Sequence, residues 1–382
     1  MRFEDLLSRH ERGELSQMEA ASLLGMSERT FRRWRERHAE EGEGGLRDRR
    51  IGKPSSRRAG VEAIQQMLGL YREEYADFTV KHFHEHLVRR HGYKLGYTTT
   101  KVYLQRSGLV VAAARRGAHR RKRPRRPLPG MLLHQDGSQH AWLPGDDRRY
   151  DLIVTLDDAT SAVCSLFLVA EEGTASTFRG LAETIERRGL FCALYTDRGS
   201  HYFHTPTAGG KVSKEQLTQV GRALRELGIE HIAAYSPEAR GRSERLFGTL
   251  QDRLPKEFRL AGIRTPAAAN RWLREVYLEQ HNARFAVAAE RQGTAFVADR
   301  RGTWRDILCV QEDRVVGNDN TVKWRGLSLQ LPPSPLRAHF VKATVRLREY
   351  WDGRLSISLG PHRLAGFEAD GTAPTKPTRK AA

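Results

Sequence analysis

Three acidic residues have the types and positions needed for phosphate chemistry with metal ions. Asp136 stands in HQDGS, Asp197 in YTDRGS and Glu244 in GRSERLF. Carboxylate oxygens are the ligands that Mg²⁺ prefers, and several are needed to hold two such ions beside one phosphodiester. If the fold brings these three acids together, we expect a site for two Mg²⁺ ions, with Mn²⁺ able to substitute.

The stretch from 131 to 258 predicts elements that would place the acids together. Its predicted strands are 131–143, 148–160, 161–172, 190–200 and 229–236, and its predicted helices are 174–189, 214–228 and 237–258. This order is typical of a mixed sheet flanked by helices. Asp136 lies in the first strand, Asp197 follows the fourth, and Glu244 lies on the last helix. The first and fourth strands can be neighbours, so the three acids can converge.

Each acid alone also has an ordinary structural explanation. Asp136 would satisfy a strand end, and Asp197 would form a turn. Glu244, among arginines, would make a surface salt bridge worth about 0–1 kcal/mol. The pair Asp157–Asp158, at the end of the second predicted strand, is a rival acidic site. The order of strand acid, strand acid and helix acid within a basic chain favours the metal site.

The 382-residue chain is strongly basic, with a net charge of +19, and 53 of its 65 basic residues are Arg. Residues 1–130 hold 29 basic and 16 acidic side chains, residues 131–260 hold 16 and 18, and residues 261–382 hold 20 and 12. Arg suits bidentate contact with phosphate, although a GC-rich genome would also raise the Arg content. A near-neutral middle between basic flanks indicates arms that hold a polyanion around a metal-dependent centre.

Other metal sites are not predicted. The three cysteines are Cys164, Cys192 and Cys309. They form no CxxC pair, so neither a zinc site nor a disulfide framework is expected. Four histidines cluster in one predicted helix and the turn after it, at His82, His84, His86 and His91. Because no cysteine accompanies them and two histidines on one helix face are an incomplete zinc set, we interpret them as surface histidines.

Residues 15–42 predict a helix-turn-helix. Ser27 is the expected N-cap of a second helix that turns Phe31 and Trp34 inward. The outward arginines of that helix are Arg29, Arg32 and Arg33. An ordinary helical hairpin is the alternative, but the basic charge of the chain favours a DNA reader.

A basic linker is predicted at residues 111–130. Its basic residues are Arg115, Arg116, Arg120, Arg121, Lys122, Arg123, Arg125 and Arg126, with no acid among them. Pro and Gly residues deny this stretch a stable helix. A solvated spacer is one explanation, but a like-charged run of this density indicates an anionic partner, here the DNA backbone.

The whole chain is thus predicted to be multidomain. The expected parts are a helix-turn-helix domain at 1–50, a second helical, winged-helix-like DNA-binding domain at 51–110, the linker at 111–130, the α/β core at 131–290, a small β-barrel at 300–368 and a disordered tail at 369–382. The barrel rests on strand-like runs separated by turn signals such as Gly317–Asn318 and Asp352–Gly353.

Several stretches resemble the DDE transposases and retroviral-type integrases, which share the ribonuclease-H-like fold. They are LHQDGSQHAWL, LDDATSAVCSLF, LYTDRGSHYF and SPEARGRSERLFGTLQDRLPKEFRLAGI, followed by HNARFAV. They look most like ISNCY-type transposases of bacterial insertion sequences. The resemblance covers about 131–290 and extends more loosely to the flanks. It implies Asp136, Asp197 and Glu244 as the catalytic triad and metal ligands, and leaves Asp157–Asp158 as a structural corner or an accessory.

The chain departs from the family pattern in two places. Asp197 and Glu244 are separated by 46 residues, more than in many relatives, with the extra length around Gly209–Gly210 in a predicted surface loop. Gln251 stands where related integrases often carry a basic residue that touches DNA, and its amide can still hydrogen-bond a base or a phosphate. The arginines expected to face the phosphates near Glu244 are Arg240, Arg242 and Arg245.

The resemblance implies transposition of an insertion sequence. The chain would bind terminal inverted repeats, hydrolyse a phosphodiester at each element end and join the 3′-OH to target DNA. Its partners would be double-stranded DNA and further copies of itself, in the bacterial cytoplasm at the nucleoid and without a membrane. The alternatives are a catalytically inactive or domesticated DNA-binding regulator, which the three acids argue against, and a ribonuclease H, which would not need a helix-turn-helix.

Overall fold

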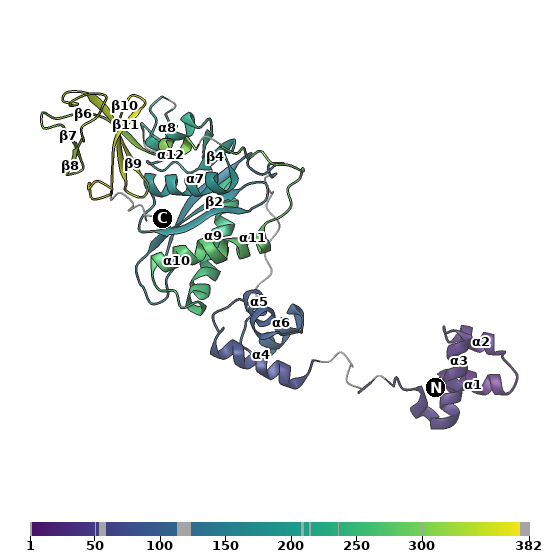
Figure 1. Ribbon diagram of the computed structural model, residues 1–382. Coiled ribbons are helices and arrows are strands. Elements are labelled where there is room, and N and C mark those ends of the chain that lie inside the picture. The colour runs from purple at the N-terminus through teal and green to yellow at the C-terminus, as the bar shows by residue number, and fades with distance from the viewer. Residues whose placement is uncertain are drawn as a thin grey trace, which may run out of the picture. The chain divides into compact units, whose positions relative to one another are not determined.

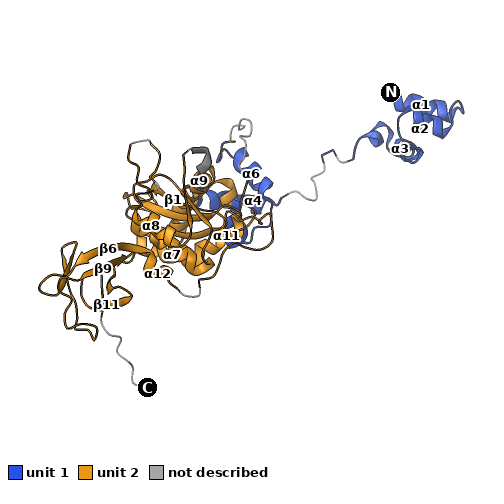
Figure 2. Cartoon of the chain, turned by 90° about the horizontal axis from the view of Figure 1, so that it is seen from above, with its two compact units in different colours: residues 1–76, 84–111 blue, residues 77–83, 112–382 orange. Residues whose placement is uncertain are grey.

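The computed structural model describes residues 2–49, 51–52, 59–112, 124–207, 210–213, 215–235, 237–299 and 302–374, without the side chains of 237–240. It divides into two compact units, one of residues 1–76 and 84–111 and the other of residues 77–83 and 112–382 (Figure 2). Some predicted DNA contacts lie outside the described residues, namely Arg115, Arg116, Arg120, Arg121, Lys122, Arg123 and the side chain of Arg240. Most of the predicted tail, 375–382, also lies outside them.

The N-terminal segment folds as the predicted helix-turn-helix. Its helices are α1 (Arg2–Glu11), α2 (Gln17–Leu23) and α3 (Glu28–Glu41), followed by the short 3₁₀ helix η1 (Gly42–Leu46). The Ser27 hydroxyl accepts a hydrogen bond from the Thr30 N–H at 3.3 Å, so the predicted N-cap of α3 is confirmed. Phe31 is fully buried against Phe3 and Ala20. The arginines on the exposed side of α3 are Arg29, Arg32 and Arg33.

Three more helices follow, α4 (Val61–Glu73), α5 (Val80–His91) and α6 (Tyr97–Arg106). Residues 77–83, which include the first turn of α5, belong to the second compact unit, and the rest of α5 belongs to the first. The predicted helical character of this stretch is therefore confirmed.

The second unit is built on a five-stranded mixed sheet. Its strands are β1 (Leu133–His140), β2 (Tyr150–Asp157), β3 (Val163–Val169), β4 (Ala193–Thr196) and β5 (Glu230–Ala233), in the order β3-β2-β1-β4-β5. β1 pairs antiparallel with β2, and parallel with β4. The prediction that the first and fourth strands lie side by side is confirmed.

Helices cover both faces of this sheet (Figure 1). One face carries α7 (Thr174–Arg188) and α8 (Gln219–Glu226), and the other carries α9 (Pro237–Leu260), α10 (Pro266–Trp272), the π-helical turn η2 (Leu273–Tyr277) and α11 (Leu278–Phe285). Leu133 of β1 packs with Leu181 of α7. Because side chains alternate along a strand, His134 and Asp136 face the α9 side instead.

The C-terminal residues that the structure describes, 302–374, contain strands but form no closed barrel. After α12 (Trp304–Ile307) come β6 (Cys309–Val315), β7 (Thr321–Trp324), β8 (Leu327–Gln330), β9 (Thr344–Tyr350), β10 (Leu355–Leu359) and β11 (His362–Phe367). Four of them form an open sheet in the order β11-β10-β9-β6, while β7 and β8 pair with each other. The predicted barrel is not found because β6 and β11 remain edge strands, and closure requires every strand to be bonded on both sides.

Candidate active site

Asp136 and Asp197 come together through the register of two parallel strands. His134 of β1 is the register partner of Tyr195 of β4, and their rings meet edge to face with 5.2 Å between centroids. Asp136 stands two residues further along β1, on the same face as His134, and Asp197 directly follows β4. Asp136 is buried and Asp197 is half-buried. The structure therefore brings two of the three predicted acids to one end of the sheet.

The loop after β4 closes over this end. The Gly199 N–H donates to Oδ1 of Asp197 at 2.9 Å, and the Tyr202 hydroxyl donates to Oε1 of Gln135 at 3.3 Å. Burial raises the pKa of Tyr202 well above its usual range, and the negative charges of Glu172, Asp136 and Asp197 raise it further. Tyr202 is therefore a neutral hydrogen-bond donor beside the carboxylates.

Glu244 lies on the helix that runs past these acids. Nε2 of Gln251 donates to Oγ of Ser138 at 3.0 Å, which fixes α9 to β1. Glu244 precedes Gln251 by seven residues, about two turns, so both lie on the same face of α9. Ser138 shares its face of β1 with Asp136. Glu244 is exposed, and among the described residues the ligand oxygens of the three acids do not all lie within 4.8 Å of one another.

A fourth carboxylate near this end was missed by the sequence reasoning. Glu172 lies three residues past the end of β3. Its Oε1 lies 3.3 Å from the Tyr202 hydroxyl, as an acceptor alternative to Gln135, and 3.6 Å from Nε2 of His201. A Cβ placed on Gly137 would stand 2.3 Å from Oε2 of Glu172. Glu172 therefore occupies the space that the glycine leaves. The signal in the sequence was the pair Glu171–Glu172, the last two residues of the third predicted strand.

The rival acids, Asp157 and Asp158, are buried and bonded to the protein. Asp157 accepts hydrogen bonds from the Gly130 N–H at 2.9 Å and from the Thr160 hydroxyl at 2.6 Å. Asp158 accepts hydrogen bonds from Nε2 of His134 at 2.8 Å and from the guanidinium of Arg242. The resemblance left the pair as a structural corner or an accessory, and these contacts favour the corner.

Some of the predicted DNA-contact arginines near the site are hydrogen-bonded within the protein. The guanidinium of Arg125 donates to the Asp158 carbonyl at 3.0 Å and to the Ser161 hydroxyl at 2.8 Å. Burial and the nearby charge of Arg242 lower the pKa of Arg125. Arg245 is exposed on α9, and the backbone N–H of Arg126 donates to Asp158. Arg125 and Arg242 thus make contacts within the protein as well as being candidates for phosphate contact.

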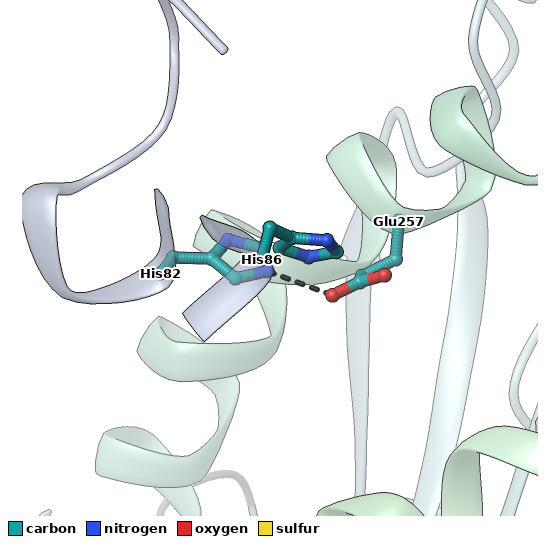
Figure 3. Close-up of side chains that lie close together, drawn as sticks. All are labelled: His82, His86 and Glu257. Carbon is teal, nitrogen blue, oxygen red and sulfur yellow. Dashed lines mark hydrogen bonds and ion pairs between the residues drawn. The ribbon is translucent and has the colours of Figure 1, made fainter. Parts of the chain in front are cut away.

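The surface interpretation of the clustered histidines is wrong for His82 and His86, which are buried. Nε2 of His82 donates to Oε1 of Glu257 on α9 at 2.7 Å, and His86 lies one turn further along α5 (Figure 3). The His82 ring also stacks on Phe78 with 4.3 Å between centroids. Asp77 pairs with Arg259 at 2.7 Å. Phe78, His82 and Phe83 of this segment are buried, while Asp77, Thr79 and Lys81 are exposed.

Comparison with known proteins identifies the family. The model described as winged helix-turn helix matches residues 6–63. Over 365 residues the chain is 32% identical to the protein named as transposase y4bF of Sinorhizobium fredii. The alignment covers 94% of this chain and 79% of that protein. It is also 25% identical, over 308 residues, to the transposase for insertion sequence IS1202 of Streptococcus pneumoniae, across 72% of this chain and 65% of that protein. The chain belongs to the DDE-type transposases of insertion sequences.

Two solved structures are similar to this transposase. The catalytic core domain of HTLV-2 integrase, in complex with magnesium (dimeric form), is 19% identical with a TM-score of 0.29, across 38% of this chain and 86% of that chain. A chain of the simian T-cell lymphotropic virus intasome in complex with PP2A regulatory subunit B56 gamma is 18% identical with a TM-score of 0.36, across 71% of this chain and 88% of that chain.

Among the described residues of the transposase, no helix combines the length and apolar character that crossing a membrane requires.

Proposed function

We propose that the transposase binds the terminal inverted repeats of its element, hydrolyses the phosphodiester at each end and joins the freed 3′-OH to target DNA. The observation that supports this proposal is the parallel pairing of β1, which carries Asp136, with β4, which Asp197 directly follows, together with the bond that fixes α9, which carries Glu244, to β1. Family membership supplies the substrate class, which is double-stranded DNA.

The donor set fits a divalent cation. Asp136, Asp197 and Glu244 offer only carboxylate oxygens, which suit hard cations, and acids gathered at one end of a sheet repel one another unless a cation lies between them. These three would hold two Mg²⁺ ions, or Mn²⁺ in their place. When bound, such ions activate the attacking oxygen and stabilise the leaving oxygen of a phosphodiester.

Both chemical steps are displacements at phosphorus. In the first, a water oxygen forms a bond to phosphorus, the bond to the 3′-oxygen breaks, and the products are a 3′-OH and a 5′-phosphate. In the second, that 3′-OH attacks a target phosphorus, and the target's own 3′-oxygen leaves and takes up a proton. Neither step needs a covalent protein–DNA intermediate, so no Ser or Tyr nucleophile is assigned. The chain's own part in both steps is to orient the scissile phosphate for in-line attack.

DNA binding is divided between recognition and positioning. The exposed arginines of α3, Arg29, Arg32 and Arg33, are assigned to base edges in the major groove. The basic linker, together with Arg242, Arg245 and Gln251 of α9, is assigned to the DNA near the scissile bond. Because two element ends must be joined in one event, the active form is a homo-oligomer on DNA.

A cleavage and strand-transfer assay on a duplex with an element end tests the proposal. Asp136→Asn, Asp197→Asn and Glu244→Gln should each remove both Mg²⁺-dependent reactions and leave end binding nearly unchanged. Asp252→Asn, on the same helix and paired with Lys256 at 2.5 Å, is the matched control and should remain active. Activity in Glu244→Gln would contradict the assignment. End binding without cleavage by the wild-type protein would indicate a DNA-binding regulator instead.

A further inference from the structure

Asp158 links three segments of the second compact unit at a buried position. The side chain is fully buried at the end of β2. Its Oδ1 accepts hydrogen bonds from Nε2 of His134 at 2.8 Å and from the guanidinium of Arg242, and its Oδ2 accepts one from the Arg126 N–H at 2.8 Å. One carboxylate therefore contacts β1, α9 and the segment that leads into β1.

Two of these partners stand two residues before proposed metal ligands. His134 precedes Asp136 by two residues, and both side chains lie on the same face of β1. Arg242 precedes Glu244 by two residues on α9. Asp158 is thus bonded both to the strand that carries the first acid and to the helix that carries the third.

A second contact between β1 and α9 sets the distance over which this link acts. Gln251, nine residues after Arg242 on α9, donates to Ser138, four residues after His134 on β1, at 3.0 Å. From His134 to Ser138 the strand rises about 13 Å, and from Arg242 to Gln251 the helix rises about 13.5 Å. Because the two lengths match, α9 runs alongside β1 between two fixed points. Asp136 and Glu244 both lie between those points. The Asp158 link therefore helps to set the position of Glu244 relative to Asp136 along the direction of the strand.

The neighbouring Asp157 has a different role, although it is also buried. Its oxygens accept hydrogen bonds from the Gly130 N–H at 2.9 Å and from the Thr160 N–H at 2.8 Å, which hold the start of β1 and the turn between β2 and β3. Among the described residues, the side-chain hydrogen bonds of Asp157 reach Gly130 and Thr160 and none reaches α9. Asp157 is therefore a matched control, with the same side chain and similar burial but without the link to the helix.

We propose that Asp158 is a positioning residue for transposition, which fixes Glu244 relative to Asp136 through Arg242 and His134. This inference rests on the function proposed above. Asp158 is not assigned to the metal site itself. Its charge holds the first turns of α9 against β1, so that the Glu244 carboxylate stands near the other two acids when DNA arrives.

The test compares Asp158→Asn, Asp157→Asn and Arg242→Gln in the full-length protein. Hydrogen–deuterium exchange without DNA reports the position of the helix directly. In Asp158→Asn and Arg242→Gln, amides at the start of α9 should exchange faster, while those of β1 and β2 keep their protection. Asp157→Asn should instead speed exchange in the turn between β2 and β3. Unchanged exchange at the start of α9 in both Asp158→Asn and Arg242→Gln would overturn the inference.

A Mg²⁺ titration of end cleavage provides the functional readout. Displacing a residue that supports a metal ligand lowers metal affinity or activity by about 10–100-fold, so the titration midpoint should rise by that factor in Asp158→Asn and Arg242→Gln but not in Asp157→Asn. The double variant should be no worse than either single one, because both act through one link. A wild-type midpoint in both single variants would leave Asp158 as a corner residue only.

The remaining outcomes separate this inference from the proposed function. If Arg242→Gln weakens end binding without changing the Mg²⁺ midpoint, the guanidinium serves DNA and the link is refuted. If Asp158→Asn does not fold, Arg242→Gln decides the matter, because it leaves the bonds of Asp158 to His134 and Arg126 in place. If Asp136→Asn keeps Mg²⁺-dependent cleavage, the proposed function itself fails. If Asp136→Asn loses cleavage but Asp158→Asn has the exchange and the Mg²⁺ midpoint of the wild type, only the inference is overturned.

Discussion

The rings of His134 and Tyr195 meet across two parallel strands, with 5.2 Å between their centroids. The contact fixes which residues of β1 and β4 stand opposite one another. Two positions further along are Asp136 and Asp197. A slip of one residue would turn every side chain of a strand to the other face and would present Gly137 instead of Asp136. The pairing of the acids therefore depends on register within the core of the sheet.

Gly130, which precedes β1, should be the less tolerant of two glycines when each is replaced by alanine. Its φ is +83°, and an added Cβ would stand 2.8 Å from the Phe296 backbone nitrogen. Gly130→Ala should lower the free energy of unfolding by at least about 1–2 kcal/mol. Gly248, on α9, has nothing within 4 Å of an added Cβ, so Gly248→Ala should raise it by about 0.5–1 kcal/mol. Urea unfolding measures both, and equal effects would contradict the prediction.

The buried pair of His82 and Glu257 should contribute more to the free energy of unfolding than an exposed ion pair does. The side chains are 0% and 10% exposed, and removing one partner of such a pair costs about 3–5 kcal/mol. Glu257→Ala should therefore strongly destabilise the second unit, and Glu257→Gln should cost less because its amide oxygen can still accept. The control is Glu186→Ala, which breaks an exposed pair with Arg305 and should cost about 0–1 kcal/mol. Similar unfolding midpoints for the two alanine variants would refute the contrast.

Stability should fall in mild acid because two histidines are buried in neutral form. Burial lowers the pKa of His231 and of His281 to about 4, from an ordinary value near 6.5. Between these pH values the unfolded chain binds more protons, so the free energy of unfolding decreases as pH falls from about 6.5 to about 4, by on the order of 2–3 kcal/mol per histidine.

Urea unfolding at a series of pH values checks this dependence. His281→Gln should flatten the decrease between about pH 6.5 and pH 4, since glutamine takes up no proton there. His339→Gln is the control, because His339 is exposed in the folded protein and should leave the decrease as in the wild type. A decrease of the same size in His281→Gln would assign the acid sensitivity to other groups.

The sheet and the order of the acids could be predicted because both depend on local pattern. Apolar runs, turn residues and Ser27 as an N-cap are visible over a few positions, and they fix where strands and helices begin. The place of Asp197 directly after β4 follows from the same signals. Long-range pairing is less visible. The edges of β6 and β11 stay open, and nothing local in either strand distinguishes an open sheet from a closed one.

Burial of the histidines could not be predicted for a similar reason. His82 is buried because Glu257, 175 positions later, lies beside it on α9. The sequence shows a basic, polar helix at 80–91, which is typical of an exposed surface. In the same way, Asp158 was recognised as an acid at a strand end, but its bonds to His134 and Arg242 join segments that only the folded chain brings together.

The recognition helix α3 should control the choice of DNA sequence. Arg29 and Arg33 are exposed four residues apart, on one face of the helix. A good bidentate contact to a base is worth about 1–3 kcal/mol of discrimination, so Arg29→Ala or Arg33→Ala should narrow the affinity gap between terminal-repeat and random DNA. Competition binding at fixed salt measures the gap. If it stays constant in both variants, sequence is read elsewhere, and residues 79–107 become the next candidates.

The basic linker should add affinity without adding specificity. Two of its eight basic residues also make contacts within the second unit, because Arg125 bonds to Ser161 and the N–H of Arg126 bonds to Asp158. The useful variant therefore replaces only the other six, Arg115, Arg116, Arg120, Arg121, Lys122 and Arg123, with Gln. Each phosphate contact contributes about −0.9 to the log–log salt slope, so their loss should flatten the slope by at most about 5.

The same variant should weaken binding to terminal-repeat and random DNA by similar factors, because phosphate contacts position the protein but do not read the sequence. A salt titration of binding to both duplexes measures slope and specificity together. The control is Arg29→Ala, which should change specificity more than slope, since its assigned contact is to a base. Equal slopes for the wild type and the neutralised linker would mean that the run is a solvated spacer. A change in the preferred end sequence would mean that the linker reads bases after all.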